Sequence, residues 1–267
     1  MKRFPTSSFC NAALAGLIAA CALIAQPAPR YRFAQGFGGG MIGNGLLHGT
    51  VTGAPFSATE TTKSQRTLSN GTQILNQQES NVYRDAEGRV RIDSTITRPA
   101  STSGGTPTTT QVSTIYDPVA GYIYRLNPAK MTAVQSPIPK RNSSSSSSST
   151  STPPKRTPPA GVTVQTQSLG TSTINGVTAN GTQVTTTIAA GTFGNSAAIQ
   201  NVRITWTSPE LQIPVQITVS GPQTGNSSMN LTNIVQASPD ESLFQVPSGY
   251  TTTQAHARGG ARPAFRR

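Results

Sequence analysis

Side chains that could act as nucleophiles, general bases or metal ligands are few, and they lie far apart. The two histidines, His48 and His256, lie in a glycine-rich leader and in the C-terminal tail. Neither region is expected to hold an imidazole rigidly enough for general-base catalysis. The two cysteines, Cys10 and Cys21, both lie near the N-terminus. A Ser-His-Asp site or a zinc site is therefore not expected, and the sequence predicts no catalytic, cofactor-binding or metal-binding residue.

Three carboxylates, Asp85, Glu87 and Asp93, are close enough in sequence to bind Ca²⁺ or to form a hydrolytic carboxylate pair. The segment Asp85–Gly88 is also typical of a tight turn, where acidic residues are common. Three arginines next to these acids would neutralise them, namely Arg84, Arg89 and Arg91. We therefore interpret Asp85 and Glu87 as parts of a hairpin turn, with the acids neutralised by the arginines.

Large apolar residues in the second half of the chain could form a binding surface. Trp206, the single tryptophan, could line an apolar groove together with isoleucines of the following strands, Ile213, Ile217 and Ile234. Such a groove would favour binding of an amphiphile, whereas a filled core would favour a structural role. Further aromatic residues allow the same two interpretations: Tyr116, Tyr122, Tyr124, Phe244 and Tyr250.

The N-terminus resembles a bacterial export signal. Met1–Asn11 carries two positive charges and no acid, and the apolar run Ala12–Ala25 is too short to span a bilayer. Residues 1–25 are therefore predicted to be a signal segment. Ile18–Cys21 resembles a lipobox, in which Cys21 would be lipidated. Ala20–Ala22 also fits ordinary signal peptidase cleavage, and Leu23–Ala25 allows a later cut.

The net charge of +12 does not indicate a nucleic-acid-binding protein, because of where the charges lie. Twelve basic residues, enough to account for the excess, lie outside the segments expected to fold: Lys2, Arg3, Arg30, Arg32, Lys140, Arg141, Lys155, Arg156, Arg258, Arg262, Arg266 and Arg267. The other nine basic residues are matched by nine acids. A nucleic-acid surface would need a basic face on the folded part, so no specific nucleic-acid partner is expected.

The residues that would position any site follow a β pattern with little helical periodicity. Short strands are predicted at Val51–Phe56 and at Arg89–Asp93, and Leu231–Val235 is predicted to be the last strand. Asn-Gly pairs predict turns at 70–71, 175–176 and 180–181, and Asp240–Phe244 could form one helical turn. The fold class is therefore mainly β: a curved antiparallel sheet or half-barrel with few or no long helices.

Low-complexity segments divide the chain. Residues 26–49 form a Gly/Pro leader, 137–160 a Ser/Pro insertion with seven consecutive serines, and 253–267 a basic tail. Insertion and tails are predicted to be disordered. The rest, 50–252, is predicted to be one β domain. Deleting Asn142–Thr157 is expected to leave the thermal midpoint nearly unchanged, because loop closure entropy changes by only about 0.6 kcal/mol per doubling of length.

Several segments resemble an exported protein family of acidobacterial type. They are Gly53–Ser57, Tyr83–Arg91, Tyr116–Gly121, Leu169–Val177, Ser208–Leu211 and Ser242–Tyr250. The resemblance covers about 50–138 and 160–252. It implies export and no activity.

The second half is also similar to the periplasmic lipoprotein-carrier half-barrel family. The matching patterns are Leu-x-x-Pro-Val at Leu211–Val215, Leu-x-Asn-Ile at Leu231–Ile234, and Ser-Leu-Phe-x-x-Pro from Ser242. The resemblance implies a curved sheet whose concave apolar face holds acyl chains. The helices that fill the concave face of the carriers have no clear counterpart in this sequence.

These observations together predict an exported, non-catalytic envelope or secreted protein of a bacterium, located in the periplasm, the cell envelope or outside the cell. Its sheet would bind a lipid, another amphiphile or an envelope component. A structural or adhesive surface protein is the alternative, and a carboxylate-dependent hydrolase is a third. The sequence indicates no oligomeric state and no transmembrane helix after the signal.

Overall fold

The computed structural model describes residues 46–47, 49–98, 105–139, 158–222 and 225–255. The predicted signal segment with Cys21 lies outside these residues. So do nearly all of the leader, most of the Ser/Pro insertion, and the tail after Ala255. No helix within the described ranges is long and apolar enough to cross a membrane.

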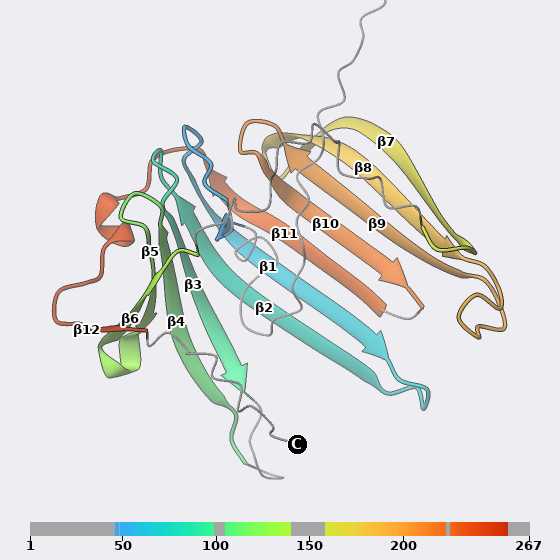
Figure 1. Ribbon diagram of the computed structural model, residues 1–267, viewed down its shortest axis with the longest axis horizontal. Coiled ribbons are helices and arrows are strands. Elements are labelled where there is room, and N and C mark those ends of the chain that lie inside the picture. The colour runs from blue at the N-terminus through green and yellow to red at the C-terminus, as the bar shows by residue number, and fades with distance from the viewer. Residues whose placement is uncertain (1–45, 48, 99–104, 140–157, 223–224, 256–267) are drawn as a thin grey trace, which may run out of the picture. The chain divides into compact units, whose positions relative to one another are not determined.

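Twelve strands form one open, curved sheet (Figure 1), as the sequence predicted. The first half of the chain provides β1 (Phe56–Thr67), β2 (Gln73–Arg84), β3 (Val90–Arg98), β4 (Thr108–Asp117), β5 (Tyr122–Asn127) and β6 (Thr132–Pro137). The second half provides β7 (Val162–Ile174), β8 (Val177–Ile188), β9 (Ile199–Ser208), β10 (Ile213–Gly221), β11 (Gly225–Val235) and β12 (Thr251–Gln254). Two short 3₁₀ turns, η1 (Pro128–Lys130) and η2 (Glu241–Phe244), lie between β5 and β6 and between β11 and β12.

The strand order shows how the two halves combine: β12-β6-β5-β4-β3-β2-β1-β11-β10-β9-β8-β7. The chain starts in the middle of the sheet with β1 and meanders to β6 near one edge. It resumes at β7 on the opposite edge and meanders back until β11 pairs antiparallel with β1 over Ser57–Gln65. The C-terminal β12 then pairs parallel with β6. The two predicted β segments therefore contribute to one sheet.

Local turn chemistry explains much of this meander. Asn175 and Gly176 have φ values of 50° and 89° in the tight turn between β7 and β8, as an Asn-Gly hairpin requires. Asn70 and Gly71 turn between β1 and β2, where the Asn70 side chain accepts a hydrogen bond from the Thr72 amide at 3.0 Å. η2 confirms the helical turn predicted at Asp240–Phe244.

The third Asn-Gly pair, predicted to be a turn, is not one. Asn180 and Gly181 lie inside β8 and pair with Thr207 and Trp206 of β9. A Cβ atom at Gly181 would lie 2.7 Å from the Trp206 ring. Gly181 is therefore required because the indole lies directly over the backbone. A glycine inside a strand often marks such a close approach.

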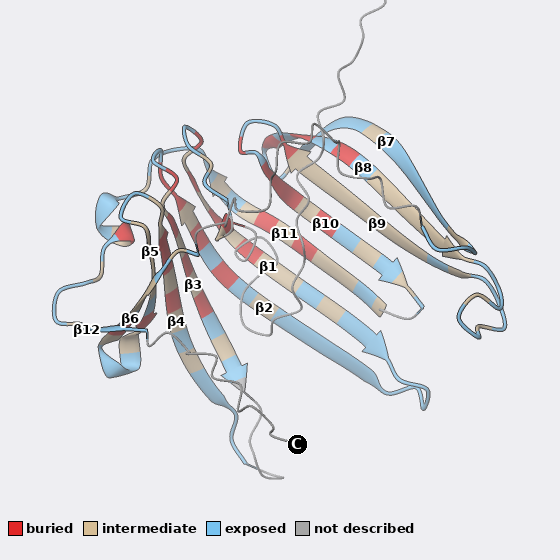
Figure 2. Cartoon of the chain, in the orientation of Figure 1, coloured by how far each residue is buried: buried red, intermediate tan, exposed pale blue. Residues whose placement is uncertain are grey.

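Two apolar clusters lie on opposite faces of the first half of the sheet. Val90 and Tyr116 pair with each other, and Arg91 pairs with Ile115; neighbouring residues in a strand point to opposite faces. We call the face that carries Phe56, Val82, Val90, Tyr116 and Leu231 the inner face, and the other the outer face. Figure 2 shows the buried positions concentrated toward one end of the central strands, the end at which β1 begins and β2 ends, while the opposite strand ends are exposed.

Candidate binding face

The inner face holds most of the larger of the two apolar clusters of the described residues. On β1 to β3 the rows Phe56–Arg84–Val90 and Ala58–Val82–Ile92 lie side by side. On the other side of β1, Leu231, Met229 and Ile217 continue the apolar surface. All these residues are buried. Leu46, which is in helical conformation, and Leu47 pack against the cluster.

The same face becomes polar further along the strands. Glu60 pairs with Ser80, and Ser80 pairs with Ser94 in the next row. All three are buried, and the two serine hydroxyls lie 2.8 Å apart. In the row beyond, the partly buried Gln78 pairs with Thr62, and its side-chain nitrogen has no hydrogen-bond partner among the described residues. On β1 to β3 the inner face is thus amphipathic along the strand direction, whereas on β11 the apolar Leu231 and Met229 lie opposite Glu60 and Thr62.

Arg84 is a fully buried cation at the apolar end of this face. Its Nε and Nη2 donate to the carbonyl oxygen of Ala54 at 2.9 and 2.7 Å, and Nη2 donates to that of Leu211 at 2.6 Å. The guanidinium lies 4.9 Å from the centre of the Phe56 ring. Arg84 therefore joins the start of β1 to the loop between β9 and β10, 127 residues away. Charged side chains are buried at this depth only when such partners satisfy them.

Replacing Arg84 with methionine is expected to destabilise the fold by about 3 kcal/mol, because two buried carbonyl oxygens lose their donors. For a domain of this size that corresponds to a fall of roughly 6–12 °C in the thermal midpoint. Arg125→Met is the matched control, since Arg125 is exposed and such changes stay within about 0.5 kcal/mol. Equal melting curves for the two variants would contradict a structural role of Arg84.

The four predicted groove residues do not line one face. All four belong to the larger apolar cluster or pack against it, and Ile213 and Ile217 are 1 % exposed. Ile217 pairs with Thr205 and Met229 on the inner face, whereas Trp206 pairs with Gln216 and Gly181. Because Thr205 and Trp206 are consecutive in β9, the indole and the Ile217 side chain leave opposite faces of the sheet. Ile234 is partly buried near the end of β11.

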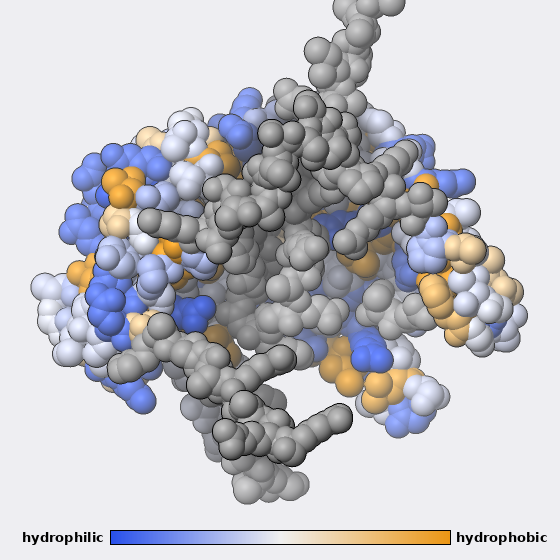
Figure 3. Space-filling view, in the orientation of Figure 1, coloured by the Kyte–Doolittle hydropathy of each residue, from blue (hydrophilic) through white to orange (hydrophobic). Residues whose placement is uncertain are grey.

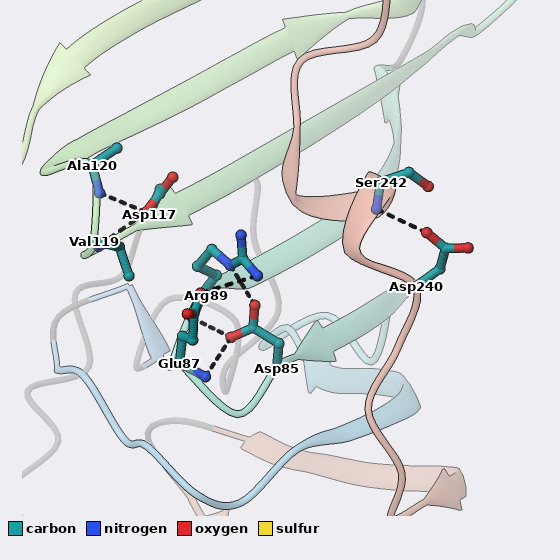
Figure 4. A network of polar contacts seen from close by, with 8 residues as sticks. All are labelled: Asp85, Glu87, Arg89, Asp117, Val119, Ala120, Asp240 and Ser242. Carbon is teal, nitrogen blue, oxygen red and sulfur yellow. Dashed lines mark hydrogen bonds and ion pairs between the residues drawn. The ribbon is translucent and has the colours of Figure 1, made fainter.

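The acidic residues of the β2–β3 turn form ion pairs (Figure 4). Asp85 contacts the Arg89 guanidinium and accepts hydrogen bonds from the amides of Glu87 and Arg89 at 3.0 and 2.8 Å. Arg89 also lies 3.1 Å from Glu87. Burial alone would lower the pKa of Arg89, but the hydrogen bond and charge of Asp85 and the charge of Glu87 outweigh it, so the pKa is raised. Arg91 similarly holds Asp93 at 2.8 Å.

These contacts confirm Asp85 and Glu87 as parts of a turn, with one correction to the arginines. Arg84, which the sequence placed among the neutralising arginines, turns into the core and binds backbone carbonyls instead. Across the described residues, no group of three or more His, Cys, Asp or Glu side chains is arranged to hold a metal ion.

The outer face of β3 to β6 is covered by the C-terminal segment. Ile115, Leu126 and Ala133 form a second apolar cluster, with Val246 and Tyr250 packed against it. Two arginines hold the C-terminal segment against this face. Arg91 of β3 donates to the carbonyl oxygen of Leu243 at 3.0 Å, and Arg89 of the preceding turn lies 5.5 Å from the centre of the Phe244 ring. At the start of η2, hydrogen bonds from Ser242 lower the pKa of Asp240. This face therefore has a cover within the chain.

No protein-family model matches the chain, and no curated protein sequence matches it. Solved structures are similar at low identity. An uncharacterized conserved protein from Thermus thermophilus is 10 % identical, with 76 % of this chain and 91 % of that chain covered and a TM-score of 0.37. In the MucA/MucB complex of Pseudomonas aeruginosa the match is 12 % identical and covers 79 % of this chain and 62 % of that chain, with a TM-score of 0.38.

A LolA superfamily protein from Nitrosomonas europaea is 6 % identical over 76 % of this chain and 94 % of that chain, with a TM-score of 0.29. The solved structures that are similar to this chain thus include a member of the LolA superfamily, at low identity and low TM-score. The resemblance to the acidobacterial-type family has no counterpart in these comparisons.

Proposed function

We propose that this protein is an exported, non-catalytic component of a bacterial envelope that holds an amphiphile on the inner face of its sheet. The observation that carries the proposal is the change of that face from apolar to polar along β1 to β3. The row Ala58–Val82–Ile92 would contact the acyl chain, because burial of methylene groups against apolar side chains is favourable. The polar rows around Ser80 and Gln78 would contact the head group.

The inner face is covered by side chains of the protein itself, so a ligand must displace them in order to bind. Leu46 is 3 % exposed, and it packs with Leu47 against the inner cluster. A bound acyl chain would take the place of these two side chains, so binding exchanges one apolar contact for another. The specificity would then come from the polar rows, where the Gln78 amide nitrogen gains a partner.

Replacing Gln78 with leucine is expected to weaken binding of a fluorescent long-chain fatty acid by roughly fivefold, the equivalent of about one hydrogen bond. The thermal midpoint should not fall, since the variant removes a buried donor that has no partner among the described residues. Asn76→Leu is the matched control: Asn76 is exposed one row further along the same face. The measurement is a fluorescence titration of the purified protein.

Native mass spectrometry of protein purified from its own host tests the proposal directly, through co-purified lipid. A structural or adhesive role is the second candidate, and the burial of Ile213 and Ile217 in a filled cluster favours it. Absence of both bound lipid and fatty-acid binding would contradict the proposed function and support the structural role.

A further inference from the structure

One end of the sheet carries exposed apolar side chains on two separate projections. The β1–β2 hairpin exposes Leu68, Ile74 and Leu75, and the β8–β9 loop, residues 189–198, exposes Phe193. The strand register places both at the same end: Gln65 pairs with Asn226, Asn226 with Ser220, Ser220 with Val202, and Ile199 with Ile188. We call Leu68–Leu75 and residues 189–198 together the rim.

Both projections are ordered by their own hydrogen bonds, so the apolar side chains are held outwards. In the β8–β9 loop, the Asn195 side chain donates to the carbonyl oxygens of Ala189 and Ala197 at 2.9 and 2.8 Å and accepts from the Phe193 amide at 3.1 Å. Phe193 remains 67 % exposed. In the hairpin, the Leu68 amide donates to the Thr72 carbonyl oxygen at 2.8 Å, while Leu75 is 69 % exposed. Figure 3 shows apolar surface at the hairpin tip.

The charges beside the hairpin tip have one sign. Lys63 and Arg66 are exposed on β1 just before the hairpin tip, and Arg66 pairs with Ile74. No acidic residue occurs in Thr61–Gln78 or anywhere between Val119 and Pro209. The acids of the β2–β3 turn, and Asp117 of the β4–β5 turn, lie at the opposite end of the sheet. The rim therefore carries apolar tips and no acid, with Lys63 and Arg66 beside the hairpin tip and the exposed Glu79 one row further from the tip than Lys63.

We infer that the rim docks on the surface of an anionic phospholipid bilayer. Isolated apolar tips, one of them with two cations beside it, fit a lipid interface, where apolar side chains enter the acyl boundary and basic residues contact anionic head groups. A stable protein–protein interface would instead require a continuous, complementary surface of more than about 1,000 Å². Two tips on separate projections do not form such a surface, but a fluid bilayer accommodates both at once.

The test is flotation of the purified protein with vesicles of phosphatidylglycerol and phosphatidylethanolamine, compared with phosphatidylcholine alone. The protein should float with the anionic vesicles, and the double variant Leu75→Ser/Phe193→Ser should bind them at least about tenfold more weakly. The matched control is Val119→Ser, because Val119 is 68 % exposed in the turn at the other end of the sheet. Lys63→Gln and Arg66→Gln should each cost roughly fivefold, and Arg125→Gln should cost nothing.

Two flotation results would overturn the inference: no binding of the unaltered protein to anionic vesicles, or equal binding by the unaltered protein and the double rim variant. A third contrary result would be rim substitutions that change only self-association, as measured by light scattering. Equal binding by the rim variant that is lost at high salt would assign the attraction to other basic segments. The inference does not rest on the proposed function, since vesicle binding is measured without added ligand and the rim variants should still bind the fluorescent fatty acid.

Discussion

Residues 158–255 expressed without the first half of the chain are expected to be unfolded or aggregated. In the intact protein β11 pairs with β1, and β12 pairs with β6. Without the first half, β11 becomes an open edge, and Met229 and Leu231, both fully buried in the protein, lose their neighbours on β1. An open edge with apolar residues beside it is prone to aggregation. A fragment of about 100 residues without disulfides has little stability to compensate for that loss.

Circular dichroism and NMR of the fragment measure this loss, and addition of residues 46–139 should restore dispersed signals. The matched control is the whole chain cut once within residues 140–157 by an inserted protease site. Both halves should then stay associated, because the β1–β11 ladder joins them without a covalent link. A sharp, reversible melt of the isolated fragment would show that the second half is an independent domain.

The sequence predicted the fold class because the relevant signals are local. Alternating residues such as Val90 and Ile92, and Asn-Gly pairs such as 175–176, indicate strands and hairpins directly. The boundaries at β1 were wrong: a strand was predicted at Val51–Phe56, whereas β1 begins at Phe56 and runs through the polar Thr59–Thr67. Pairing with strands on both sides provides the partners that hold this polar segment in a sheet.

The pairing of strands that are far apart in the sequence could not be predicted from local sequence patterns. Nothing local distinguishes β11 as the partner of β1, or Thr251–Gln254, half of which was assigned to the tail, as a parallel edge strand. The predicted groove failed as one surface for a related reason. The pattern of single strands indicates which residues share a face within a strand, but only the register between β9 and β10 shows that Trp206 and Ile217 leave opposite faces. Gly181 beneath the indole was similarly ambiguous until its partner was known.

The inward turn of Arg84 was missed because its sequence neighbours are acids. Three positions from Glu87 and beside Asp85, an arginine is expected to form ion pairs. Its position directly opposite Phe56 and Val90 places it on the apolar inner face instead. The alternation along the strand was a usable signal. Arg84 lies two positions after the apolar Val82, so both side chains are expected on the same face of the sheet.

Deleting Asn142–Thr157 is now expected to lower the thermal midpoint by well over 10 °C, contrary to the expectation from loop entropy alone. The insertion connects β6 and β7, which lie ten strand spacings apart in the sheet order, or roughly 48 Å along the sheet. The two attachment points also lie at opposite strand ends. Pro137 pairs with Tyr122 beside the β4–β5 turn, whereas Val162 pairs with Ile188 beside the rim.

The reach of the shortened chain decides the outcome. If the sheet curved into a half-circle, its two edges would still be about 30 Å apart. Pro137 and Val162 also lie at opposite strand ends, which adds a perpendicular distance of about 30 Å. The two attachment points are therefore roughly 40 Å apart. The deletion leaves about nine peptide steps between Pro137 and Val162, which extend to at most roughly 32 Å. The shortened chain must therefore unpair residues of β6 or β7 to connect the two edges.

A matched control separates the effect of linker length from the effect of linker sequence. Replacing Asn142–Thr157 with a Gly/Ser sequence of the same length keeps the reach, so its thermal midpoint should stay within a few degrees of that of the unaltered protein. Loss of stability in the deletion alone would assign the effect to the span between opposite edges. An equal loss in both variants would mean that the side chains of the insertion contribute contacts, and no loss in either would contradict the placement of β6 and β7 at opposite edges of one sheet.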